Sequence, residues 1–116
     1  MLSYQKLEVY KKAFNLNKIV YTLLKENPKI PNYVKNQLGR ASLSIVLNIA
    51  EGSEKFTNKD RRSFFVIVRG SVFESAAIIE ILYAEHEISL DLQKELNVSL
   101  EEISKMLYAM IKNLEN

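Results

Sequence analysis

Hydrophobic residues recur at intervals of three and four along four segments of the chain, and short polar connections separate these segments. This spacing puts apolar side chains on one side of a helix and is typical of amphipathic α-helices. The pattern predicts helices over residues 3–25, 33–51, 58–85 and 90–114. Helices joined by short connections pack as antiparallel neighbours. We therefore expect an all-α protein, an antiparallel up-down-up-down four-helix bundle that forms a single domain over residues 1–116.

Residues with known preferences for helix ends mark four of the predicted boundaries. Asn32 is the expected N-cap of the second helix, and Gly52 is expected to end that helix in a left-handed conformation. Thr57 and Asp60 resemble a capping box at the start of the third helix, with Asp in place of the usual Glu. Ser89 is the expected N-cap of the fourth helix.

The last segment allows two interpretations. The run from Ser99 to Glu102 could begin a separate helix after a break near Asn97. No Gly or Pro interrupts the segment, so we favour one continuous helix.

Composition narrows the classes of chemistry open to the chain. It has no Cys and one His, which excludes disulfides, thiolate metal sites, cysteine nucleophiles and sites with several histidines. Ferritin-like di-iron bundles need a Glu three residues before a His on two helices, whereas Tyr83 stands three before His86. We therefore expect no metal and no cofactor. His86 itself, between Glu85 and Glu87, is expected to be a solvated residue at a helix end.

Two further classes of structure are not expected. No apolar run reaches the roughly 18 residues that a membrane span needs. The first residues lack the basic segment and apolar run of a signal peptide. The sequence therefore predicts a cytoplasmic protein with no membrane partner.

Charge is distributed unevenly along the chain. Residues 1–73 contain 13 basic and 5 acidic residues, a net charge of +8, whereas residues 74–116 contain 3 basic and 9 acidic residues, a net charge of −6. Such an asymmetry can mark a basic surface for an anionic partner. It is equally compatible with two halves that neutralise each other within one bundle or oligomer.

A polar stripe interrupts the otherwise apolar second helix. Its members are three or four positions apart and so share one face. The stripe consists of Gln37, Arg40, Ser44, Asn48 and Glu51. In an antiparallel pair with the third helix we expect Arg40 to meet Glu74, and Glu51 to meet Arg69, because desolvated charges need partners. The stripe and Glu74 together predict a structural network that fixes the register of the two helices.

A catalytic role for Glu51 or Glu74 is the alternative to this structural network. No histidine, metal-ligand set or pair of nucleophile and base stands beside either carboxylate in the sequence pattern. We therefore expect no enzymatic activity and no catalytic residue.

A basic stretch spans residues 55–62, where four cations and one acid occupy the expected loop and first turn of the third helix. Cations beside helix N-terminal N–H groups suit phosphate. The alternative is a solvated loop with local ion pairs, for example to Glu54. On the functional interpretation, the expected contacts to RNA or DNA are Lys55, Lys59, Arg61 and Arg62, helped by Lys11, Lys12 and Arg69.

The first three predicted helices carry broader apolar faces than a bundle of this size needs. Each of them shows two adjacent apolar stripes, whereas one stripe per helix suffices to form a bundle core. The surplus suggests burial between subunits, so we expect a homo-oligomer.

Three segments also resemble a known family. The second helix contains the run Gln37-x-x-Arg40-Ala41-x-x-Ser44-Ile45-x-x-Asn48-Ile49-Ala50-Glu51-Gly52. Residues 64–74 and residues 4–13 are similar to the family's second motif and to its start. On these motifs the chain resembles the four-helix-bundle family named for open reading frames in 23S rRNA intervening sequences, sometimes labelled S23 ribosomal protein.

The resemblance implies properties that the residue pattern alone does not give. It implies a ring-like homopentamer without enzymatic activity. It also implies kinship with the accessory variability determinant of diversity-generating retroelements, a basic, barrel-shaped pentamer that binds nucleic acid and a reverse transcriptase. We therefore favour a bacterial nucleic-acid-binding accessory protein. The alternative is an oligomeric scaffold that holds a basic partner such as a reverse transcriptase.

Overall fold

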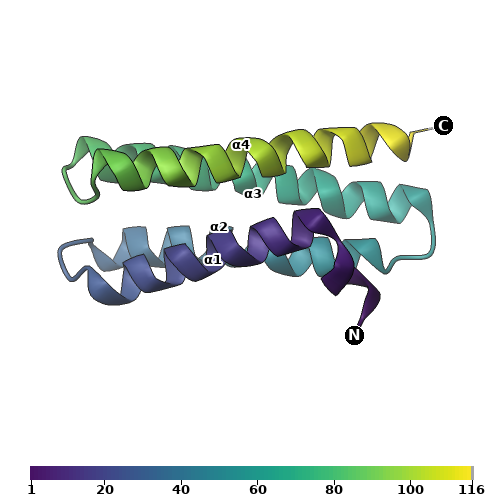
Figure 1. Ribbon diagram of the computed structural model, residues 1–116, viewed down its shortest axis with the longest axis horizontal. Helices are drawn as coiled ribbons and strands as arrows, with labels where there is room; N and C mark the ends of the chain where they lie inside the picture. Colours follow the sequence, from purple (N-terminus) through teal and green to yellow (C-terminus); the bar gives the residue numbers. More distant parts are fainter. Residues whose placement is uncertain (116) are drawn as a thin grey trace.

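Four long α-helices and one preceding 3-10 turn make up the computed structural model, which describes residues 1–115 (Figure 1). The elements are η1 (Ser3–Lys6), α1 (Glu8–Glu26), α2 (Asn32–Ser53), α3 (Asn58–Ala84) and α4 (Leu90–Asn113). Each long helix packs against two others, in the order α1, α2, α3, α4 and back to α1. The result is an elongated up-down-up-down bundle of 45 × 25 × 22 Å, as the hydrophobic pattern predicts.

The core is a continuous column of aliphatic side chains contributed by all four helices. Its residues repeat at spacings of three and four, and burying each stabilises the fold by about 1.5–3 kcal/mol. The largest fully buried members include Leu16, Leu38, Ile45, Ile79, Leu82, Leu96, Ile103 and Leu107. Ile30 and Ile88, from the α1–α2 and α3–α4 connections, are buried as well and close one end of the column.

The start of α1 differs from the prediction. Residues Ser3–Lys6 form a 3-10 turn, and Leu7 is extended with φ −71° and ψ 131°, so the α-helix begins at Glu8. The carboxylate of Glu54 accepts hydrogen bonds from Ser3 Oγ and, at 3.1 Å, from the backbone N–H of Tyr4. These contacts fasten the first turn to the α2–α3 connection. The periodicity of the sequence does not indicate such a contact between distant residues.

Both predicted ends of α2 were wrong in detail. Pro31, not Asn32, is the N-cap, and its carbonyl accepts from the N–H groups of Val34 and Lys35 at 3.0 Å. Gly52 does not turn into a left-handed conformation, because α2 continues through it to Ser53.

The N-caps of α3 and α4 are confirmed. Thr57 Oγ1 accepts from the backbone N–H of Asp60 at 3.1 Å, and Ser89 Oγ accepts from the N–H of Leu92 at 3.1 Å. The fourth helix runs from Leu90 to Asn113 without the break considered near residue 97.

The end of α3 is a Schellman motif with a histidine in its left-handed position. His86 has φ 60°. Its N–H donates to the carbonyl of Tyr83 at 3.0 Å, and the N–H of Glu87 donates to the carbonyl of Leu82 at 2.8 Å. Glycine usually occupies this place, because a Cβ is unfavourable there.

No helix within residues 1–115 has the length and apolar character to cross a membrane.

Candidate nucleic-acid interface

The middle of the polar stripe forms a hydrogen-bonded contact between α2 and α3. Ser71 Oγ donates to Ser44 Oγ at 3.0 Å. Asn48 Nδ2 donates to Ser44 twice, to its carbonyl oxygen at 2.9 Å and to its Oγ at 3.0 Å. Toward the other end of the interface, Gln37 Nε2 donates to Glu74 Oε2 at 2.5 Å. The bonds among Ser44, Asn48 and Ser71 satisfy half-buried polar groups at an otherwise apolar interface, whereas the Gln37–Glu74 bond is exposed.

The two predicted ion pairs across α2 and α3 were wrong. Glu74 accepts from Gln37 instead of Arg40, and Arg69 lies on the side of α3 that faces α4, away from Glu51. Arg40 and Glu51 are exposed. Water solvates both charges, so neither needs a partner on the neighbouring helix.

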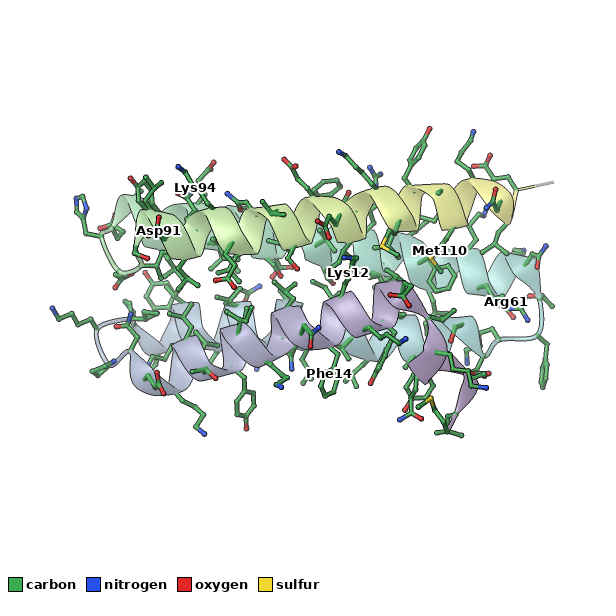
Figure 2. All side chains as sticks on the ribbon, in the orientation of Figure 1. Lys12, Phe14, Arg61, Asp91, Lys94 and Met110 are labelled. Carbon is green, nitrogen blue, oxygen red and sulfur yellow. The ribbon has the colours of Figure 1, made fainter. Side chains whose placement is uncertain are left out.

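The basic cluster lies at one end of the bundle. We use this name for Lys55, Lys59, Arg61 and Arg62, which occupy the α2–α3 connection and the first turns of α3. Figure 2 shows Arg61 at this end, whereas Asp91 and Lys94 lie at the opposite end. Lys59 and Arg62 are exposed, and Lys55 and Arg61 are half-buried.

Two of these cations also order the connection itself. Arg61 Nε donates to the carbonyl oxygen of Lys55 at 2.6 Å, which ties the first turn of α3 back to the preceding loop. Lys55 Nζ lies 4.9 Å from the centroid of the Phe64 ring, within cation–π distance. Lys59 and Arg62 therefore present the uncommitted charges of the basic cluster.

Lys11 and Lys12 do not join the basic cluster. Lys11 Nζ lies 3.3 Å from Glu8 Oε1 on the same helix, and Lys12 Nζ lies 2.7 Å from Glu102 Oε2 on α4. Figure 2 shows Lys12 where α1 faces α4, away from Arg61. The hydrogen bond and charge of Glu102 raise the pKa of Lys12. Both lysines are engaged with carboxylates instead of being directed to a common anion.

Arg69 lies along the seam between α3 and α4 and is held by two aromatic rings. Its Cζ is 5.1 Å from the centroid of Phe73 and 5.4 Å from that of Tyr108. Its Nε is buried and has no hydrogen-bond partner within residues 1–115. The sequence pattern indicated Arg69 as a candidate site residue but not Phe73, Tyr108 and the nearby Lys112. Which residues meet across two helices depends on the register of the helices.

Two shallow hollows extend the basic cluster along this seam. Lys59 and Arg62 line the first, of about 440 Å³, together with Leu114 and Glu115 at the end of α4. Arg69, Phe73 and Tyr108 line the second, of about 330 Å³, and Glu115 borders both hollows. The arrangement offers cations and exposed rings. Among residues 1–115 no three His, Cys, Asp or Glu side chains are grouped as metal ligands.

Comparison with known proteins gives likenesses to one family model and to solved structures. The family model described as 23S rRNA-intervening sequence protein matches residues 5–109. The crystal structure of a protein with unknown function from the S23 ribosomal protein family of Bacteroides thetaiotaomicron is similar to the chain, with a TM-score of 0.85. The two are 24% identical, over 90% of this chain and 98% of that one, a likeness that concerns the fold. A search of the curated proteins found no match.

Proposed function

Because the chain belongs to the family of 23S rRNA-intervening sequence proteins, we propose that it is a non-enzymatic, oligomeric accessory protein that binds RNA or DNA. One observation carries this proposal: four cations gather at one end of the bundle, and two of them, Lys59 and Arg62, are exposed. The proposal places the protein in the cytoplasm, where nucleic acid is accessible to it.

The mode of binding follows from the chemistry of the basic cluster. Lysine and arginine neutralise phosphates and release condensed counterions, so affinity falls as salt rises. Phosphate contacts position a protein on a nucleic acid without reading its bases. We therefore propose recognition of charge and shape with little sequence preference.

Exposed apolar side chains support the oligomeric part of the proposal. Leu43 and Leu47 lie one turn apart on the outer face of α2 and are 47% and 55% exposed. Val66 and Ile67 are exposed on α3. Apolar groups in such numbers on neighbouring helices favour burial against another subunit. The ring-like pentamer implied by the resemblance is the assembly we propose.

Fluorescence anisotropy across a range of salt concentrations tests the binding. Structured RNA, duplex DNA and an RNA–DNA hybrid would each be titrated with the wild type and with the K59E/R62E variant. We expect the variant to bind more weakly and its slope of log K against log salt to be less steep by about 2, since each lost phosphate contact removes about 0.9.

A variant with the same change in charge at the opposite end of the bundle is the control. Lys29 and Lys94 are exposed there, and K29E/K94E should retain most of the wild-type affinity. Salt-independent binding, or equal affinity of K59E/R62E and the wild type, would contradict the proposal.

A second candidate function is a scaffold that holds a basic protein such as a reverse transcriptase. The observation that favours it is the acidic end of the bundle, where Glu80, Glu85, Asp91 and Glu95 are exposed. Complementary charge steers such an association. A partner that remains bound in a pull-down after nuclease treatment would support this function, whereas release by nuclease would support nucleic-acid binding.

A further inference from the structure

A groove runs along the seam of α3 and α4, continuous with the basic cluster. It consists of the two hollows that share Glu115 as a border. We call it the α3–α4 groove and define it by Lys59, Arg62, Arg69, Phe73, Tyr108 and Lys112.

The register of two antiparallel helices assembles this groove. On α3 its residues Lys59, Arg62, Arg69 and Phe73 are separated by three, seven and four positions, which is two turns or less at each step, so they lie on one side of the helix. Tyr108 and Lys112, one turn apart on α4, face them. From Lys59 to Phe73 the groove extends about 21 Å at 1.5 Å per residue. This length matches about six nucleotides at the 3.4 Å spacing of a stacked strand.

The electrostatic balance of the groove favours an anion. Four of its lining residues are cationic, and Glu115 is the acidic residue among them. Glu115 pairs with Lys112 at 3.4 Å, which leaves Lys59, Arg62 and Arg69 without a carboxylate partner in the described part of the chain. Three cations that have no carboxylate partner and are spaced along a groove fit the repeated charges of a phosphate backbone.

The aromatic rings give the groove a second property. Phe73 and Tyr108 are each 54% exposed, although both rings also contact the Arg69 guanidinium. Exposed rings between cations provide surfaces on which unpaired bases stack. In a duplex, the bases are already stacked on each other and cannot reach such rings.

We infer that the α3–α4 groove binds a single strand of RNA or DNA, with phosphates on Lys59, Arg62 and Arg69 and unpaired bases on Phe73 and Tyr108. This inference rests on the proposed function and narrows it, because it names the class of nucleic acid and the path of the strand. A second copy of this chain seated on the two rings is the competing occupant, and the test below includes it.

The first test removes the rings and keeps every charge. The F73A/Y108A variant and the wild type would be titrated with oligo-uridine and oligo-thymidine of about 12 nucleotides, within the usual site sizes. A duplex RNA of the same length is the comparison. We expect the variant to lose about 5-fold or more in affinity for both single strands and to bind the duplex as the wild type does.

Exposed tyrosines elsewhere give the matched control. Tyr21 on α1 and Tyr33 on α2 are exposed and lie outside the groove, so Y21A/Y33A should bind single strands like the wild type. Light scattering would measure the molar mass of the wild type and of each variant, to show whether a substitution changes the assembly.

The outcomes separate the inference from the proposed function. If the wild type binds no nucleic acid at low salt, both fail. If it binds but F73A/Y108A keeps full affinity for the single strands, the inference fails and the proposed function stands. If F73A/Y108A changes the molar mass of the assembly, the groove is a contact between copies and the inference is overturned.

A tryptophan probe tests the position of the bases independently. The chain contains no Trp, so F73W introduces a unique fluorophore into the groove. Its emission should change when a single strand binds and stay constant when the duplex binds. The Y33W variant, with its probe outside the groove, should not respond, and an equal response from both probes would contradict the inference.

Discussion

At the scale of single residues, Gly52 shows how closely two helices approach. A Cβ built on Gly52 would lie 2.5 Å from Cβ of Phe64 and 3.3 Å from a ring carbon of Phe65. Both neighbours sit on the first turns of α3, and only four residues separate the end of α2 from the start of α3. Glycine is therefore required here for the close packing of α2 against α3, not for a turn.

This close approach predicts the effect of adding one methyl group. We expect G52A to lower the free energy of unfolding by about 1–3 kcal/mol, because the new methyl group forces α2 and α3 apart. Urea denaturation followed by circular dichroism measures the change. Gly70 is the matched control, since nothing lies within 4 Å of its Cβ position. G70A should raise stability by roughly 0.5–1 kcal/mol, and equal stability of G52A and the wild type would contradict the packing described here.

His86 permits the opposite experiment, in which a residue is made smaller to gain stability. Because its φ of 60° is unfavourable for a side chain with a Cβ, we expect H86G to raise the free energy of unfolding by roughly 0.5–1 kcal/mol. Thermal unfolding at neutral pH provides the measurement. H86A keeps the Cβ and should show no gain, so a similar gain in both variants would point to the lost imidazole instead of the backbone.

At the scale of elements, the Lys12–Glu102 pair is the exposed ionic link between α1 and α4. The raised pKa of Lys12 means that folding favours its protonated form. The pair therefore contributes to stability below the ordinary lysine pKa of 10.5, and the contribution disappears as pH rises through the higher pKa of the folded state.

A double-mutant cycle with K12M and E102Q tests this pH dependence. The coupling between the two side chains should be favourable at pH 7 and should be lost at a pH above the raised pKa of Lys12. A coupling that is the same at both pH values would show that packing, not charge, links the two side chains.

Sequence periodicity predicts the elements well because helix formation depends on neighbours three and four residues away. Thr57 and Ser89 fix the starts of α3 and α4 by bonds within one turn, which a sequence displays directly. The start of α1 depends on Glu54, some fifty residues away, and the role of Gly52 depends on Phe64 of another helix. Contacts of that kind can be predicted only when the register between the packed helices is known.

The residues of the candidate site also fall into two groups: those whose position follows from the sequence and those whose position depends on helix packing. Lys59 and Arg62 are close in sequence, so their common position at one end of the bundle follows from the pattern. Arg69 is different, because a residue on α3 can turn toward either α2 or α4. The prediction paired it with Glu51 on α2, whereas it lies between Phe73 and Tyr108 at the α4 side. Register across helices decides this choice and determines which aromatic residues line the groove.

At the scale of the whole molecule, the exposed leucines of α2 predict an effect on assembly. We expect L43E/L47E to dissociate the proposed oligomer while the far-ultraviolet circular dichroism stays helical, because both side chains are exposed and lie outside the core. Native mass spectrometry would report the change. V98E, at an exposed position on α4, adds charge to another face and should leave the mass unchanged. An unaltered mass for L43E/L47E would exclude this face of α2 as the contact.

An even number of antiparallel helices returns the chain to the end of the bundle at which it started. Figure 1 accordingly shows the N-terminus and the end of α4 on the half of the molecule that carries the α2–α3 connection. Any segment joined ahead of η1 or behind α4 would therefore emerge beside the basic cluster and compete for space with the nucleic acid that we propose binds there. For surface immobilisation, an anchor in the α1–α2 connection, for example at Lys29, would keep the end that carries the basic cluster directed into solution.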